Sequence, residues 1–364
     1  MPSLNLNLVL RITFSFFISL VLGINYAEAQ TVLHSVYLIG DAGKDEVPGR
    51  VLQMLKQELD SVKTGTVIFL GDNIYPKGLT DENAKNRMLA QLVSVKDFKG
   101  NVVVVPGNHD WKQGLWQGPQ ILKKEEEFVE QYLIANSTAA NKDASTFSPQ
   151  NGLPGPETFL IANKIRLICI DTQWWLQSQF FHPTPKPNGL NRHQTTKLFQ
   201  ARLDSLMQVA KANNEQVVVA AHHPMFTMGH HGRPKQPLRF LVNWTPFQVF
   251  GLVGLNRMLV QDTHQPRYKR MKKRILSVLD NYPNTLYVSG HDHNLQHFIH
   301  KKNHYLVSGA GSKLSSIEHE TPEAKLLNGL ENGFMKVEFL ESGHCQLKVW
   351  GSKSGWELYK VGLY

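Results

Sequence analysis

The sequence predicts an α/β fold with additional β structure near its C-terminus. Five short runs rich in Val, Ile and Leu predict buried strands, and helical patterns lie between them, which is the order of α/β proteins. The strand-like runs are 36–40, 66–70, 101–106, 217–221 and 285–289, and the helical patterns lie near 47–63, 81–95, 119–135 and 193–213. After residue 303, successive strand-like runs follow at 304–308, 334–340, 344–350 and 356–361, and the turn 341–343 joins two of them as a hairpin.

Composition indicates a folded protein with a large core. The chain has 364 residues, of which 41% are hydrophobic and 19% are charged, so it suits one large domain or two small ones and not a disordered segment. It has two cysteines, Cys169 in the strand-like run 165–170 and Cys345. We interpret Cys169 as a free buried thiol, although a disulfide with Cys345 is also compatible with the sequence. Because zinc-type cysteine pairs are lacking, any metal must be held by Asp, Asn, His or Tyr.

The N-terminus has the pattern of a secretory signal peptide. An apolar run over 8–21 is followed by Ala27-Glu28-Ala29, a small-x-small cleavage signature. We therefore expect residues 1–29 to be removed and the mature protein to be exported, periplasmic or extracellular. An uncleaved N-terminal anchor is the alternative.

The formal net charge of +9 is unevenly distributed, because six basic residues lie within 267–274. Such a run could bind a phosphate-rich partner or a membrane surface. We favour the solvated face of a helix, since Met271, Ile275, Val278 and Leu279 supply an apolar stripe behind it. No nucleic-acid motif accompanies the run, so we expect no specific nucleic-acid partner.

Two stretches read as insertions between the regular elements. Residues 142–158 are rich in Pro, Gly, Ser and Thr and predict a loop, and residues 232–266 contain an uncharged run over 240–256. Pro246 and the interspersed polar residues of that run argue against a membrane span. A lid or an extra packed helix is the expected role, with an interfacial patch as the alternative.

Each of the five predicted strands ends in side chains that bind metals. Open α/β sheets place ligands at the carboxyl ends of their strands, and hard cations take oxygen donors and imidazole nitrogens from separate segments. Seven donors and one shared carboxylate, Asp72, suit a two-metal site that orients a phosphate. Taken alone, the stretch 71–75 could equally be an Asp-Asn turn with Tyr75 packed in the core. The donors are Asp41, Asp72, Tyr75, Asn108, His222, His291 and His293.

These five segments resemble the sequence blocks of the calcineurin-like metallophosphoesterase superfamily, in the same order. The blocks are 40–43 (Gly-Asp-Ala-Gly), 71–75 (Gly-Asp-Asn-Ile-Tyr), 107–110 (Gly-Asn-His-Asp), 219–222 (Val-Ala-Ala-His) and 290–293 (Gly-His-Asp-His). The superfamily normally has a histidine where this chain has Gly43. In its purple acid phosphatase branch a tyrosine in the second block replaces that histidine, and Tyr75 is present.

Within that branch the sequence is most similar to the small, tartrate-resistant type, on the segments 290–296 and 308–311. The resemblance covers about 34–231 and 284–350 and leaves 232–283 uncovered. It implies a four-layer αββα sandwich with two mixed β-sheets. Residues 30–364 would form a single domain with an inserted segment at about 232–283.

The resemblance also implies the roles of the site residues. Fe(III) would be held by Asp41, Tyr75, His293 and the bridging Asp72. A divalent iron, zinc or manganese would be held by Asp72, Asn108, His222 and His291. His109 matches the substrate-binding and proton-donating histidine of the family. His231 matches a second such histidine, although the adjacent His230 could take that position; we interpret His223 as structural.

The function implied is hydrolysis of phosphomonoesters by direct attack of a metal-bound hydroxide, at acidic pH, on a small phosphate-ester substrate. The alternative is a phosphodiesterase or nucleotide hydrolase of the same fold with a different metal pair. A non-catalytic binding scaffold would be expected to have lost ligands, and all seven are present. The natural substrate and the oligomeric state are left open.

Overall fold

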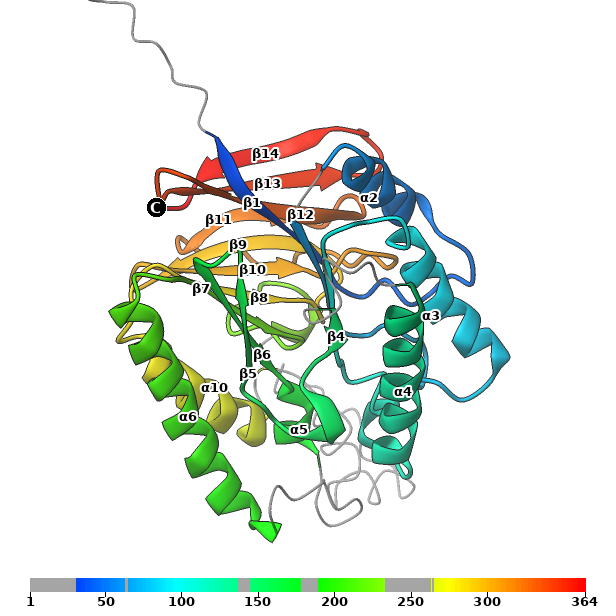
Figure 1. The fold of residues 1–364 in the computed structure, drawn as a ribbon, viewed down its shortest axis with the longest axis horizontal. Coiled ribbons are helices and arrows are strands. Elements are labelled where there is room, and N and C mark those ends of the chain that lie inside the picture. Colours follow the sequence, from blue (N-terminus) through cyan, green and yellow to red (C-terminus); the bar gives the residue numbers. More distant parts are fainter. Residues whose placement is uncertain (1–30, 63–64, 137–144, 178–188, 233–262, 264) are drawn as a thin grey trace, which may run out of the picture.

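The computed structural model describes residues 31–364 except for 63–64, 137–144, 178–188, 233–262 and 264. Its described residues form two seven-stranded β-sheets with helices on the outer face of each (Figure 1). The predicted signal peptide and most of the segment 232–266 lie outside the described residues.

The first sheet has the strand order β14-β13-β12-β1-β2-β3-β4. β1, β2, β3 and β4 are parallel neighbours, whereas β12, β13 and β14 continue the sheet as an antiparallel meander beside β1. The predicted turn 341–343 joins β12 to β13 as a hairpin. The strands are β1 (Val32–Ile39), β2 (Gly65–Leu70), β3 (Asn101–Val105), β4 (Thr146–Phe147), β12 (Gly333–Leu340), β13 (Cys345–Gly351) and β14 (Glu357–Gly362).

The second sheet has the order β11-β9-β10-β8-β7-β6-β5 and is also mixed. β6, β7, β8 and β10 are parallel, and antiparallel strands close both edges. The strands are β5 (Glu157–Ile161), β6 (Ile165–Ile170), β7 (Gln216–Ala221), β8 (Thr285–Ser289), β9 (Leu295–His300), β10 (Asn303–Ser308) and β11 (Ala324–Asn328).

The two sheets pack face to face, because alternate residues of each central strand point to opposite sides. Leu38 of β1 and Ile68 of β2 belong to the same apolar cluster as Val218 of β7 and Leu306 of β10. The residues of β1 and β2 that point to the opposite side belong to a second apolar cluster, which also contains residues of the helices. The strands are therefore apolar on both faces, as their continuous hydrophobic runs predict.

Helices cover the outer faces and complete the predicted four-layer sandwich. In Figure 1, α2 (Arg50–Asp60), α3 (Glu82–Ser94) and α4 (Gly118–Asn136) lie on one side, and α5 (Thr172–Leu176), α6 (Arg192–Ala212) and α10 (Pro266–Leu279) lie on the other. Asp81 caps α3 by accepting a hydrogen bond from the Ala84 N–H at 2.9 Å, and Asn191 forms a capping box with Gln194 at the start of α6. The described residues also include the short 3₁₀ turns Lys112–Gly114, Gln150–Gly152 and His230–Gly232.

Some elements differ from the expectation. The stretch 142–158 was expected to be a loop, but β4 and the start of β5 lie in it. β4 has only two residues and β5 is an edge strand, so neither needs the long apolar run by which buried strands are predicted. The predicted strand-like runs do not include β9 or β11 either.

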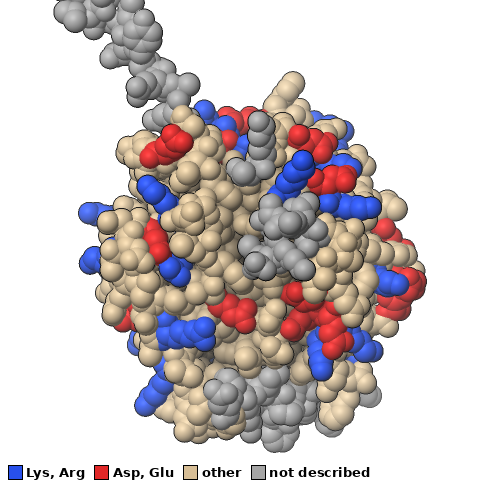
Figure 2. Space-filling model, in the orientation of Figure 1, with Lys and Arg blue, Asp and Glu red and all other residues tan. Residues whose placement is uncertain are grey.

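The basic run 267–274 lies on α10, as expected of a helix with a solvated face. Met271, Ile275, Val278 and Leu279 are buried, and Lys269 and Lys273 are exposed. On the face shown in Figure 2, basic and acidic side chains are interspersed, so the net charge of +9 does not form one broad basic surface there.

Both cysteines are buried free thiols, so the alternative of a Cys169–Cys345 disulfide is wrong for this structure. Burial raises the pKa of each thiol to about 12, which keeps both protonated and unreactive. Among the described residues, every helix is too short or too polar to cross a membrane.

Candidate metal centre

The candidate site lies where the carboxyl ends of central strands from both sheets meet. Asp41 follows β1, Asp72 follows β2 and Asn108 follows β3, whereas His222 follows β7 and His291 follows β8. Backbone hydrogen bonds cross between the sheets at this edge, from the Gly40 N–H to the Ser308 carbonyl at 2.8 Å. The structure thus brings together residues that are far apart in the sequence: the His291 backbone N–H donates to Asp41 Oδ2 at 2.7 Å across a separation of 250 residues.

Three of the site residues have left-handed backbone conformations. Asp41, Asp72 and His291 have φ angles of 58°, 53° and 72°. This conformation costs free energy for a side chain with a Cβ and is typical of functional turns. Gly71, with φ of 87°, precedes Asp72, and a Cβ there would lie 2.6 Å from the His222 Nδ1, so the turn requires glycine.

One group of donor atoms consists of Asp41 Oδ1, Tyr75 Oη and His293 Nε2. The Tyr75 hydroxyl donates to Asp41 Oδ1 at 2.7 Å and lies 3.2 Å from His293 Nε2, which is 3.5 Å from the same carboxylate oxygen. Burial and the carboxylates of Asp41 and Asp72 raise the pKa of Tyr75 well above its usual value. A cation at this position would act in the opposite direction and favour the phenolate.

A second group consists of Asn108 Oδ1, His222 Nε2 and His291 Nδ1. The amide oxygen lies 3.0 Å from each of the two ring nitrogens, and these are 3.2 Å apart. The His222 Nδ1–H donates to the Leu70 carbonyl at 2.8 Å, which leaves Nε2 as the lone-pair donor facing the site. Burial lowers the pKa of both His222 and His291, which favours the neutral form that binds a metal.

Asp72 lies between the two groups. Its Oδ1 is 3.3 Å from His222 Nε2 and accepts a hydrogen bond from the His109 N–H at 2.9 Å. Burial opposes its ionisation, but the imidazoles of His222 and His109 outweigh that effect and hold the pKa of Asp72 below its usual range. Burial and the neighbouring Asp72 raise the pKa of Asp41.

Convergent oxygen and nitrogen atoms of this kind fit hard cations. Asp41, Asp72 and His222 offer ligand atoms within 4.8 Å of one another, and all three are buried. Each of two neighbouring buried carboxylates disfavours the ionisation of the other, and positive charge between them reduces this repulsion. The seven residues predicted as ligands therefore form two donor sets around one shared carboxylate, which is the arrangement of a two-metal site.

Both predicted proton donors lie beside these donor sets. His109 Nε2 is 3.8 Å from Asp72 Oδ2, and its Nδ1–H donates to the Pro76 carbonyl at 2.6 Å. The His231 ring stacks on His291 with 4.0 Å between ring centroids, whereas His230 is exposed. The stacking places His231, and not His230, against the candidate metal ligands.

His223 has a structural partner. Its Nδ1 lies 2.8 Å from the Thr172 hydroxyl, which also accepts a hydrogen bond from the His223 N–H at 3.1 Å. The ring packs between His222 and His291, at centroid distances of 5.0 and 4.4 Å. This environment fits the interpretation of His223 as a structural residue.

Sequence reasoning missed the residues that hold the ligand-bearing turns. Asp110 accepts hydrogen bonds from the backbone N–H groups of Gly107, Asn73 and Ile74 at 2.7, 3.3 and 3.0 Å, so it ties the second block to the third. Burial and the charge of Asp72 raise its pKa to about 7. Asp292 is equally buried and accepts from the His231 N–H at 3.1 Å. Both are acidic residues inside the predicted blocks, which is the signal that could have identified them.

Lys313 was also missed. Its Nζ lies 3.7 Å from the centroid of the Tyr75 ring, within the range of a cation–π contact. Burial lowers its pKa, and the charges of Asp72 and Asp41 oppose that effect. Because Lys313 follows the segment 308–311 by two residues, its nearness to the site could have been suspected from that segment.

Comparison with known proteins agrees with this geometry. The profile described as Calcineurin-like phosphoesterase matches residues 34–295, well over half of the chain. The chain belongs to this family. It is therefore a metal-dependent phosphoesterase, and the family implies a binuclear metal centre.

The relatives found include purple acid phosphatases. Purple acid phosphatase 17 of Arabidopsis thaliana is 23% identical over 288 residues, which are 76% of this chain and 68% of the plant protein. Tartrate-resistant acid phosphatase type 5 of Rattus norvegicus is 27% identical over 164 residues, 43% of this chain but only 39% of the rat protein. The expected similarity to the purple acid phosphatases, including the tartrate-resistant type, is confirmed.

Solved structures share the fold. The anchor protein GAP50 of the inner membrane complex of Plasmodium has a TM-score of 0.56 at 19% sequence identity. The match covers 90% of this chain and 87% of the GAP50 chain. A dimetal phosphatase from Danio rerio has a TM-score of 0.50 at 13% identity, with coverages of 92% and 99%. These likenesses confirm the calcineurin-like sandwich.

The presence of Gly43, where the wider superfamily normally has a histidine, has a steric reason in this structure. A Cβ built at Gly43 would lie 2.1 Å from the Asn73 carbonyl oxygen and 2.5 Å from the Ile74 nitrogen. The Tyr75 N–H donates to the Gly43 carbonyl at 2.9 Å, so the first block packs directly on the second. This close approach leaves no room for the histidine common in the wider superfamily, and Tyr75 lies beside Asp41 instead.

We expect Gly43→Ala to destabilise the protein by about 1–3 kcal/mol, because the new methyl group meets rigid backbone and not a flexible side chain. Urea denaturation of the purified protein measures the change. Gly362→Ala is the matched control, since a Cβ at Gly362 meets nothing within 4 Å. Equal stability of the two variants would contradict the proposed contact between the first two blocks.

Proposed function

We propose that this protein is an exported acid phosphatase that hydrolyses small phosphomonoesters at a binuclear centre of Fe(III) and a divalent iron, zinc or manganese ion. The observation that carries the proposal is the pair of donor sets, Asp41–Tyr75–His293 and Asn108–His222–His291, on either side of Asp72. The family membership supports phosphoester hydrolysis in general. The apolar N-terminal run and its cleavage signature support export.

In this proposal Asp41, Tyr75 and His293 hold Fe(III), and Asn108, His222 and His291 hold the divalent ion, with Asp72 shared. The presence of Tyr75, a phenol that suits a hard trivalent ion, supports Fe(III). The two ions would supply Lewis acidity toward the phosphate and a hydroxide nucleophile in mildly acidic solution.

The protein's own side chains would bind the phosphate and move the proton. The Nδ1–H of His109 donates to Pro76, so its Nε2 is the atom that can carry a proton to the leaving alkoxide. His231 is held by Asp292 and by its stacking on His291, where a protonated ring would stabilise developing negative charge. The ammonium of Lys313 would attract the phosphate group electrostatically.

The primary test is to measure metal content and turnover of the mature protein with p-nitrophenyl phosphate, at acidic and neutral pH. We expect two metal ions per chain and faster turnover at acidic pH. Asp72→Ala should lose both ions and all measurable turnover, because it removes the shared ligand. An Asp72→Ala protein that retains two ions and activity would exclude the bridging role.

The same assay with bis(p-nitrophenyl) phosphate addresses the alternative activity. A monoester phosphatase should cleave the diester far more slowly than the monoester. Faster cleavage of the diester would replace the proposal by a phosphodiesterase of the same fold.

Tyr75→Phe should remove any visible charge-transfer band of the iron-loaded protein, since phenylalanine has no phenolate oxygen, while the fold is retained. Absorption spectra of protein purified in air with iron supplied provide the measurement, and circular dichroism controls for folding. A colourless wild-type protein that contains two metals and is active would show that the pair lacks an Fe(III)–tyrosinate.

His231→Ala should lower kcat by roughly 100-fold or more with both metals retained, as expected for loss of a group that stabilises or protonates the leaving group. His230→Ala is the matched control and should stay near the wild-type value, because His230 is exposed. If His230→Ala has the larger effect, the assignment of the second histidine is wrong by one residue.

A further inference from the structure

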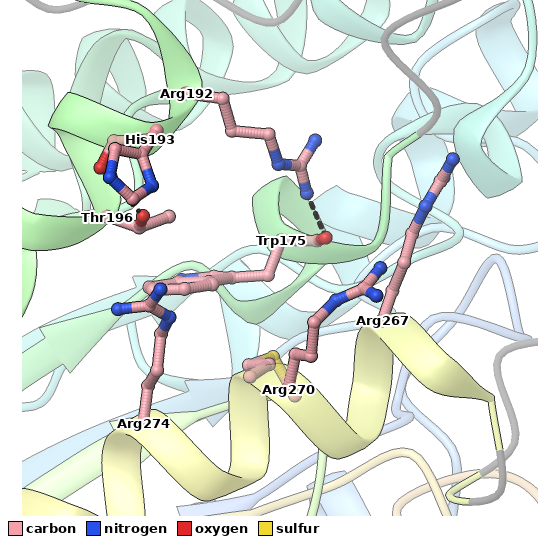
Figure 3. A pocket seen from close by; sticks show the side chains of 8 residues that line it. Trp175, Arg192, His193, Thr196, Arg267, Arg270 and Arg274 are labelled. Carbon is pink, nitrogen blue, oxygen red and sulfur yellow. Dashed lines mark hydrogen bonds between the residues drawn. The ribbon is translucent and has the colours of Figure 1, made fainter.

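A cavity separate from the candidate metal centre lies between α5, α6 and α10 (Figure 3). Its volume is about 470 Å³, within the size range of small-molecule sites. Four arginines contribute to it from two different helices. The described lining residues are Trp175, Arg192, His193, Thr196, Arg267, Arg270, Met271 and Arg274.

The arginines of α10 reach the cavity because of their spacing. Arg267, Arg270 and Arg274 are three and four residues apart, so they lie along one stripe of the helix. Arg192, at the start of α6, faces them from the opposite side of the cavity (Figure 3). Lys269 and Lys273 of the same basic run do not line the cavity and, like Arg270, are exposed. The expectation of a solvated helix face thus describes only part of the run.

Neutral acceptors, and not carboxylates, hold three of these four arginines. The Arg192 guanidinium donates to the backbone carbonyls of Trp175 and Gln177, the latter at 3.0 Å. Arg267 donates to the Leu176 carbonyl at 3.2 Å, and Arg274 donates to the Gln200 side chain at 3.2 Å. Across the described part of the chain, none of the four arginines is within salt-bridge distance of a carboxylate.

Among the described residues, no carboxylate therefore compensates the mutual repulsion of these positive charges. Burial and the charges of Arg267 and Arg270 lower the pKa of Arg192 to about 10. Burial and Arg270 likewise lower the pKa of Arg267. Like charges held together at such a cost are relieved by an anion.

We propose that this cavity binds a compact polyanion that carries several phosphate groups. Guanidinium groups bind phosphate oxygens with paired hydrogen bonds, and three of these four are already oriented by the contacts above. A concave site with arginines on facing walls fits a small, multiply charged molecule better than a membrane surface or an extended nucleic acid, which would need a continuous exposed surface. Binding there requires no metal, so this inference does not rest on the proposed catalytic function.

The test uses isothermal titration of the metal-loaded protein with myo-inositol hexasulfate. This probe is a compact ring polyanion whose sulfate esters a phosphatase does not cleave. The double variant Arg270→Ala/Arg274→Ala removes two charges from the cavity. The control Lys269→Ala/Lys273→Ala removes two charges from the exposed side of the same helix.

We expect the arginine double variant to bind the probe about 30-fold or more weakly than the wild type, the loss expected for two charge-assisted contacts. The lysine double variant should bind within a few-fold of the wild type. Turnover of p-nitrophenyl phosphate should be unchanged in both variants, which separates loss of this site from any failure of the metal centre. Thermal melts confirm that both variants are folded.

Three outcomes would overturn the proposal. No binding by the wild type would show that the cavity does not take polyanions. Equal weakening by the arginine and lysine variants would show diffuse attraction to a basic helix. Full binding by the arginine variant, together with inhibition of turnover, would place the probe at the metal centre.

Discussion

Asp41 and Asp72 bring two carboxylates into the protein interior at the point where the two sheets meet. Asp41 and Asp72 are 0% and 1% exposed, and each lies within the electrostatic reach of the other. A protein core does not tolerate such a pair without compensation. The compensation visible here is a ring of imidazoles, amide groups and a phenol whose lone pairs and dipoles converge on the same point. The sandwich provides that ring by ending the central strands of both sheets at one edge.

The same constraint explains the buried acids around the centre. Asp110 holds three backbone N–H groups of the second and third blocks, and Asp292 holds the turn that contains His231. Asp110 and Asp292 thus both fix turns of the site, and both lie within the sequence blocks that supply the candidate metal ligands. Placement of the donors therefore relies on side chains that need not touch a metal themselves.

The sequence was sufficient for the central strands and the candidate ligands, because both have strong local signals. Continuous apolar runs identify buried parallel strands, and polar residues directly after them mark the carboxyl ends. It was insufficient for β4, β9 and β11, whose pairing is decided by neighbours distant in the chain. Lys313 and the cavity lined by four arginines, here called the arginine cavity, were not predicted for a similar reason. Lys313 is defined by its contact with Tyr75, and the cavity by the approach of α6 to α10, and tertiary packing sets both.

The position of α10 bears on how the uncovered segment 232–283 should be understood. This helix does more than fill an insertion, because the Tyr268 hydroxyl donates to the Pro224 carbonyl at 2.5 Å, two residues after His222. From the other side, Thr172 at the start of α5 contacts His223. Two of the three helices that line the arginine cavity, α5 and α10, therefore also support the chain segment that presents a candidate metal ligand. The cavity and the metal centre thus share a structural support even though they share no lining residue.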